Sequence, residues 1–117
     1  MTGKLTLTDI LMEQRKKEEK YFQNYLSYAK EIKKEAERFL GEVKVFVFGS
    51  ILRKDEVPRD IDVLIVSSKL KKTSQKSKTQ AKIWKKIGFL SPFELHFITP
   101  EEYKGWYRYF LKEKKEI

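Results

Sequence analysis

The 117-residue sequence contains no cysteine and a single histidine, and these two shortages exclude whole classes of site. A chain without cysteine has neither a disulfide framework nor thiolate-bound zinc. One histidine per chain also excludes a multi-histidine metal centre. Any metal chemistry must therefore use oxygen ligands.

Long apolar runs are also missing. Charged residues interrupt the first 20 residues, so they hold no signal-peptide core, and no later stretch approaches about 18 apolar residues. We expect a cytoplasmic protein without a membrane segment. The length fits one compact domain, taken as residues 1–117.

Acidic residues are missing from the stretch between Ser67 and Leu90, which holds eight lysines. The rest of the chain is nearly balanced, with 18 basic and 17 acidic residues. Such a block attracts the phosphates of a nucleotide or a nucleic acid. The alternative is a solvated lysine face that only keeps the protein soluble. Abundant Lys and Glu with a single Asn also resemble the composition of thermophile proteins.

The first half of the sequence predicts helix followed by strand. Apolar residues recur at three- and four-residue steps from Thr8 to Leu40, which indicates one long helix or two, ended by Gly41. The β-branched and aromatic run Val43–Phe48 predicts a strand that ends in a Gly49-Ser50 turn.

The second half predicts two further strands, Asp60–Val66 and Phe93–Ile98, on either side of the lysine block. We expect a loop over Lys69–Lys78 and then a helix that ends at Gly88. The apolar face of that helix consists of Ala81, Ile83, Trp84 and Ile87.

A final helix is predicted after Thr99, because Thr99, Pro100 and Glu102 form a capping box. Its apolar face comprises Tyr103, Trp106, Tyr107 and Phe110. Trp106, Tyr107 and Tyr109 could stack a base, but an aromatic stripe at helical spacing favours core packing.

Three carboxylates stand on strands where a charge is costly. Asp60 and Asp62 point the same way on one strand, and their mutual repulsion calls for a compensating charge such as Mg²⁺. Glu94 lies on a separate apolar strand. If the two strands are neighbours, the three acids converge.

Other residues near the acids could also contact a ligand. Backbone N–H groups of the Gly49-Ser50 turn could cradle a phosphate. Arg53 could clamp a phosphate or form a surface ion pair with Asp55 or Glu56. His96 shares a strand face with Glu94 and could contact substrate or be a partly buried neighbour.

The run VFVFGSILRKDEVPRDIDVLIV resembles the nucleotidyltransferase signature of the polymerase-β-like superfamily: a hydrophobic strand, Gly-Ser, about ten residues, then Asp-x-Asp inside a second strand. The resemblance covers Val43–Val66 and extends to Glu94 as the third acid. The short chain is similar to the minimal nucleotidyltransferases. After Gly-Ser it keeps the family's arginine as Arg53 but not the glycine that often follows.

This resemblance implies an α/β (α+β) fold in which a small mixed sheet of three or more strands is flanked by helices. It implies that Gly49 and Ser50 bind nucleotide phosphates and that Asp60 and Asp62 bind Mg²⁺, with two ions between carboxylates and phosphates. Glu94 matches the third carboxylate, which can act as the base for an acceptor hydroxyl. The predicted site is therefore catalytic and metal-binding at Asp60, Asp62 and Glu94.

The reaction implied is transfer of a nucleoside monophosphate, AMP from ATP, to a hydroxyl of a protein or RNA. Minimal nucleotidyltransferases often pair with a small helical HEPN protein in a toxin–antitoxin module, so the resemblance implies such a partner. The alternative is a non-catalytic module that binds RNA or an acidic protein through the lysines of Lys69–Lys86. The edges of a small sheet also make a homodimer or a heteromer plausible.

Overall fold

The computed structural model describes residues 4–107 and 113–117. Its helical segments are α1 (Leu7–Gln23), α2 (Tyr25–Leu40), the 3₁₀ turn η1 (Ser50–Leu52), α3 (Thr73–Ile87), α4 (Pro100–Glu102) and the π-helical turn η2 (Tyr103–Tyr107). Its strands are β1 (Lys44–Phe48), β2 (Ile61–Val66), β3 (Phe93–Ile98) and β4 (Lys114–Glu116). None of these described helices is long and apolar enough to cross a bilayer.

The strands form one mixed sheet in the order β3-β2-β1-β4. β1 is antiparallel to both β2 and β4, whereas β2 and β3 are parallel. The parallel pair is joined by α3, which provides the crossover that parallel neighbours require. The predicted mixed sheet flanked by helices is confirmed.

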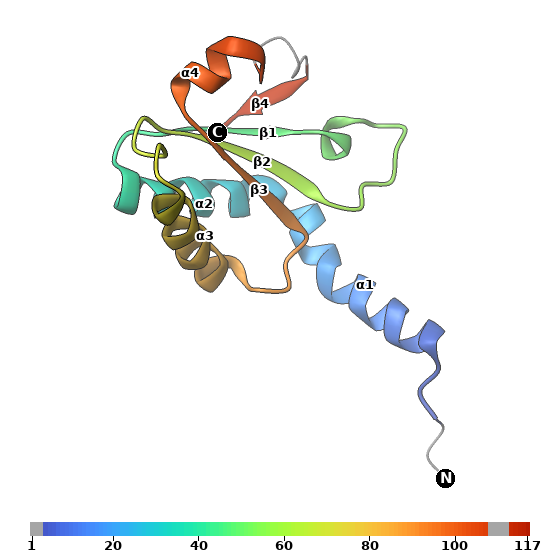
Figure 1. Cartoon of the computed structure of the whole chain (residues 1–117). Helices are drawn as coiled ribbons and strands as arrows, with labels where there is room; N and C mark the ends of the chain where they lie inside the picture. The colour runs from blue at the N-terminus through green and yellow to red at the C-terminus, as the bar shows by residue number, and fades with distance from the viewer. Residues whose placement is uncertain (1–3, 108–112) are drawn as a thin grey trace.

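One face of the sheet is covered by α2 and α3 (Figure 1). The residues that alternate toward this face are almost entirely buried, because the helices exclude water from them. The main core cluster includes Ala29, Ile32, Ala36 and Leu40 of α2, Val45 and Val47 of β1, Ile61, Val63 and Ile65 of β2, and Ile83 and Ile87 of α3.

The opposite face is covered only in part. Phe46, Leu64, Val66 and Ile98 form a smaller buried cluster, against which Tyr103 and Tyr107 pack. The Phe46 and Tyr103 rings are stacked, with centroids 5.4 Å apart.

The predicted capping box at Thr99 and Glu102 is present. The helix after it makes one α turn and continues as the π-helical turn η2. The Trp106 side chain, Tyr109 and Phe110, for which we predicted core packing, lie outside what the structure describes.

The N-terminal helical region consists of two helices that meet at Asn24. The C-terminal end of α1 is tied to the body: the Tyr21 hydroxyl donates to the Ile87 carbonyl over 2.9 Å, and the Tyr21 ring contacts Tyr28 and Phe93. From there α1 projects away from the sheet (Figure 1).

The predicted loop over Lys69–Lys78 is wrong in its second half, because α3 begins at Thr73. Thr79, Ile83 and Ile87 recur at four-residue steps and are buried, so packing favours the helix. Ala81, which we assigned to the apolar face, is exposed, and Thr79 lies in the core instead with its hydroxyl donating to the Gln75 carbonyl.

Sequence analysis missed β4, whose residues Lys114, Lys115 and Glu116 lack any strand pattern. The strand forms because its backbone pairs with β1, opposite Phe46, Val47 and Phe48. Ile117 packs against the main core.

Candidate active site

The acidic residues meet on the sheet face that the helices leave open. Asp62 lies in register with Phe48 on β1 and with Glu94 on β3. Because β2 and β3 are parallel neighbours, both carboxylates stand near the starts of their strands, on the same face. Sequence analysis left open whether these strands are neighbours; they are, and two of the three acids meet there.

A third polar side chain joins them. His96 Nε2 lies 3.3 Å from Asp62 Oδ1 and 3.9 Å from Glu94 Oε1. One ligand atom from each of Asp62, Glu94 and His96 lies within 4.8 Å of the other two. The side chains of Asp62, His96 and Glu94 are 18%, 32% and 55% exposed, so the cluster is open to a ligand on one side.

This donor set fits a divalent cation. Two carboxylates offer the hard oxygen ligands that Mg²⁺ prefers, and an imidazole nitrogen widens the choice to transition metals. Sequence analysis limited metal binding to oxygen ligands and gave His96 no place in the metal site. The signal that could have found it was the strand alternation that already put His96 beside Glu94.

Asp60 lies one residue before β2 and is half-buried. It is not part of the cluster of three, although its negative charge contributes to the field at Glu94. The structure therefore brings Asp62 and Glu94 together directly, with Asp60 beside them at the entrance of the strand.

The pKa of Glu94 is raised above its usual value. Burial is the largest cause, followed by the negative charge of Asp62, and the charge of Asp60 adds to the effect. His96 opposes the shift. A carboxyl group whose proton affinity is increased by neighbouring acids is better suited to accept a proton, and the same repulsion favours a bound cation.

Position 49, directly after β1, requires glycine because its backbone has a positive φ and passes close to Asp62. Its φ of +86° is in the region that side chains rarely adopt, and a Cβ there would lie 2.5 Å from Asp62 Oδ2. The absent side chain therefore leaves the Asp62 carboxylate its place. η1 follows directly, so the Gly49-Ser50 turn lies beside Asp62.

Arg53, at the end of this turn, pairs with acidic neighbours. Its Nη1 lies 3.2 Å from Glu56 Oε1, and its Nε lies 3.9 Å from Glu113 Oε2. This is the surface ion pair that sequence analysis left open as one alternative. Half of the Arg53 side chain remains exposed.

One aromatic side chain, Phe48 of β1, borders the cluster. The half-buried Phe48 ring lies 5.3 Å from the His96 ring between centroids, tilted by 49°. Phe48 was predicted only as a strand residue. Its place beside His96 gives the site a partly apolar edge.

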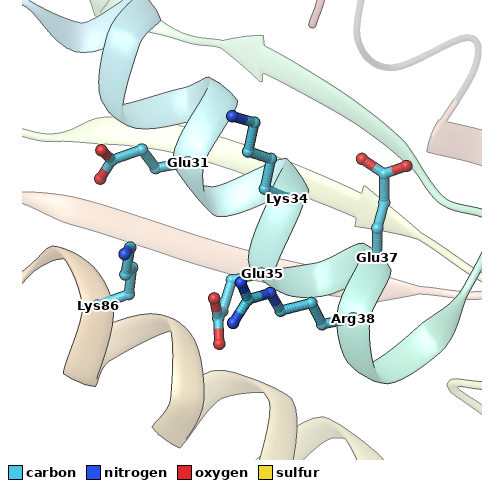
Figure 2. Close-up of a pocket in the computed structure, with 6 residues that line it drawn as sticks. All are labelled: Glu31, Lys34, Glu35, Glu37, Arg38 and Lys86. Carbon is cyan, nitrogen blue, oxygen red and sulfur yellow. The ribbon is translucent and has the colours of Figure 1, made fainter.

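A separate groove of about 550 Å³ lies between α2 and α3 (Figure 2). It is lined by charged side chains of both signs: Glu31, Lys34, Glu35, Glu37 and Arg38 from α2, and Lys86 from α3. Because α2 and α3 cover the other face of the sheet, this groove is remote from Asp62.

Comparisons with known proteins agree with this arrangement. Residues 29–116 match the family model of the nucleotidyltransferase domain. A crystal structure of a provisionally assigned nucleotidyltransferase shares 32% identity, with a TM-score of 0.64 over 75% of this chain and 95% of that chain. A provisionally assigned nucleotidyltransferase from Sulfolobus solfataricus, at 21% identity and a TM-score of 0.56 over 99% and 90% of the two chains, shares the fold. No curated protein matches the sequence.

Proposed function

The chain belongs to the nucleotidyltransferase domain family, and on that premise we propose that it transfers a nucleoside monophosphate, AMP from ATP, to a hydroxyl group of a protein or RNA. The family identifies the chain as a nucleotidyltransferase. The nucleotide, the acceptor and the need for Mg²⁺ are the proposal.

The observation that carries it is the convergence of Asp62, Glu94 and His96 beside the Gly49-Ser50 turn. The turn follows β1, whereas Asp62 lies on β2 and Glu94 on β3. The turn is nevertheless so close to Asp62 that a Cβ on Gly49 would collide with it. A phosphate held at the turn would therefore be adjacent to the acid cluster. Asp60 extends the negative charge at the same end of the sheet.

In the proposed reaction the acceptor oxygen forms a bond to the α-phosphorus while the bond from that phosphorus to the β-phosphate oxygen breaks, releasing pyrophosphate. Glu94 accepts the proton of the acceptor hydroxyl. Its raised pKa increases its affinity for that proton. Without a cation, His96 Nε2 lies 3.3 Å from Asp62 Oδ1 and orients that carboxylate; with a cation bound, the same nitrogen is available to it as a ligand.

Asp60, Asp62 and Glu94, with His96, would hold divalent cations, for which two Mg²⁺ ions are the proposed occupants. When bound, such ions neutralise phosphate charge and align the displacement. Arg53 would contribute to phosphate binding by exchanging Glu56 for a phosphate oxygen, which its exposure permits.

We further propose that the acceptor is a small helical HEPN protein, as the pairing of minimal nucleotidyltransferases implies. The toxin–antitoxin role follows from that pairing. RNA is the other acceptor class, favoured by the lysines of Lys69–Lys86. Those lysines belong to α3 and the segment before it, and α3 covers the face opposite Asp62, so an RNA bound there would have to reach around the sheet edge.

The decisive experiment follows label from α-phosphate-labelled ATP with Mg²⁺ into macromolecules of a source-cell lysate. Asp62→Asn removes one cation ligand while preserving shape, so transfer should fall by about a thousandfold or more. Asp55→Asn, in the exposed loop before Asp60, is the matched control and should transfer normally.

Label on one discrete protein that disappears with Asp62→Asn supports the proposal, and nuclease treatment separates a protein acceptor from RNA. Normal transfer by Asp62→Asn would overturn the site assignment. Failure of folded wild type to transfer any of the four nucleotides would favour the binding module. In that case RNA binding should weaken steeply with salt and disappear when several lysines are neutralised.

A further inference from the structure

The projecting helix α1 carries apolar side chains at both ends, separated by the charged and polar residues 13–20. Leu7, Ile10, Leu11 and Met12 lie at the N-terminal end, and Tyr21 and Phe22 at the C-terminal end. Tyr21 and Phe22 pack against the main core. Toward the N-terminus the large apolar side chains are exposed: Leu5 73%, Leu7 72%, Ile10 50%, Leu11 59% and Met12 58%.

A groove of about 820 Å³ runs along the same helix. Its lining is mixed: Leu11, Met12, Phe22, Val57 and Pro58 are apolar, whereas Gln14, Arg15, Lys16, Glu18, Glu19 and Arg59 are polar or charged. Val57 is 73% exposed. Large exposed apolar side chains gathered around such a groove mark an interaction surface.

The charge distribution of α1 favours a second copy of this chain as the partner that fills this groove. Residues 7–14 carry two acidic residues, Asp9 and Glu13, and no basic one. Residues 15–23 carry four basic and two acidic residues, so the two halves have opposite net charges of equal size. The helix is neutral as a whole within a chain of net charge +9, which reduces the repulsion that would otherwise oppose self-association.

We propose that α1 pairs antiparallel with α1 of a second copy of this chain, forming a two-fold symmetric dimer. In this arrangement the acidic half of each helix faces the basic half of its partner. The exposed apolar side chains of residues 5–12 of one copy then enter the groove between α1 and Val57–Pro58 of the other. The contact is the same in both directions, as a two-fold interface requires.

The dimer is tested first by sedimentation of the wild-type chain over a range of concentrations. Leu11→Arg replaces an apolar contact of the groove by a charge and should raise the dimer dissociation constant at least about tenfold. Leu90→Arg changes a residue that is 80% exposed on the loop before β3 and should leave the dimer intact. A wild type that stays monomeric would overturn the proposal and leave α1 to a different protein.

Orientation is tested by disulfide formation, which the absence of native cysteine makes unambiguous. Gln14→Cys lies near the middle of α1, where the two copies cross, and should cross-link on oxidation. Leu7→Cys lies about 10 Å from the crossing point at 1.5 Å per residue. Two copies of residue 7 would then be about 21 Å apart, beyond the reach of a disulfide, whose Cα atoms lie within about 7 Å.

Cross-linking through residue 14 but not through residue 7 supports the antiparallel pair. Efficient cross-linking through both positions would indicate a parallel pair and overturn it. A dimer that neither cysteine cross-links and that Leu11→Arg leaves intact would place the interface elsewhere. None of these measurements requires catalysis, so they remain valid whether or not the chain transfers a nucleotide.

Discussion

The two faces of the central sheet differ in how completely they are covered. On the face toward α2 and α3, Ile61, Val63 and Ile65 of β2 are fully buried. On the other face, β2 presents Asp62, Leu64 and Val66, of which the last two are buried and Asp62 is 18% exposed. One strand therefore stabilises the fold with one set of alternate residues and carries the site with the other.

This difference has an energetic basis. Apolar side chains gain stability from complete burial, whereas a carboxylate must keep contact with water or a cation. The open face is accordingly apolar at the end where Tyr103 packs and acidic at the end where Asp62 and Glu94 meet. Substitutions at successive positions of β2 should separate stability from chemistry.

The largest loss of stability is expected from a substitution on the sheet face that α2 and α3 cover. Ile65→Ala removes a fully buried side chain and should lower the free energy of unfolding by about 2–5 kcal/mol, through lost burial and a residual cavity. Urea unfolding measures this loss. Transfer per folded molecule should remain at the wild-type level, because Ile65 faces away from the site.

Asp62→Asn, three residues earlier on the opposite face, provides the reverse case. Its unfolding midpoint should equal or slightly exceed that of the wild type, because the substitution removes repulsion with Glu94, while transfer is lost. If Ile65→Ala instead impaired transfer as severely as Asp62→Asn at equal folded fraction, the two faces would not be independent.

A substitution at Gly49 should affect stability and transfer together. Gly49→Ala forces a Cβ into a backbone conformation with φ +86° and against Asp62 Oδ2. We expect a loss of about 1–2 kcal/mol in stability together with a loss of transfer, because the carboxylate must move. Thermal unfolding and the labelling assay, performed on the same preparation, measure both.

Gly105→Ala is the matched control, since among the described residues beyond its chain neighbours no atom lies within 4 Å of its added Cβ, and its φ is not in the left-handed range. It should change stability by less than about 1 kcal/mol and leave transfer intact. Full transfer by Gly49→Ala would contradict the inferred contact between the turn and the acid cluster.

Much of this architecture could be predicted from the sequence because it depends on local pattern. The strand alternation of Phe93–Ile98 placed Glu94 and His96 on one face, and the capping box located the start of the helix at Pro100. The strand order and the register between strands became known only from the assembled sheet. That Glu94 stands directly beside Asp62 is a fact of parallel pairing, which no spacing along the chain specifies.

What could not be predicted depends on distant contacts. β4 is charged and forms because β1 offers an unpaired edge. Thr73–Lys78 is polar, and it is helical because Thr79, Ile83 and Ile87 behind it dock on α2. The inclusion of His96 in the cation cluster likewise needed the distance to Asp62, a residue 34 positions away.

The smallest expected effect concerns Glu94, a charge retained at the site at some cost in stability. Burial and the charge of Asp62 raise its pKa in the folded chain, so the folded state holds this proton more tightly than the unfolded chain. The stabilising contribution of the protonated group is complete below the unfolded pKa of about 4.3 and is lost as pH rises through the folded pKa.

Glu94→Gln cannot undergo this loss. Its unfolding free energy, measured in urea with a chelator present, should rise relative to wild type as pH increases above about 4.3, by less than about 1 kcal/mol because the side chain is 55% exposed. Glu101→Gln should shift in the opposite direction, since hydrogen bonding to its own backbone lowers the pKa of Glu101. A difference between Glu94→Gln and wild type that stayed constant with pH would mean that neither burial nor the neighbouring acids raise the pKa of Glu94.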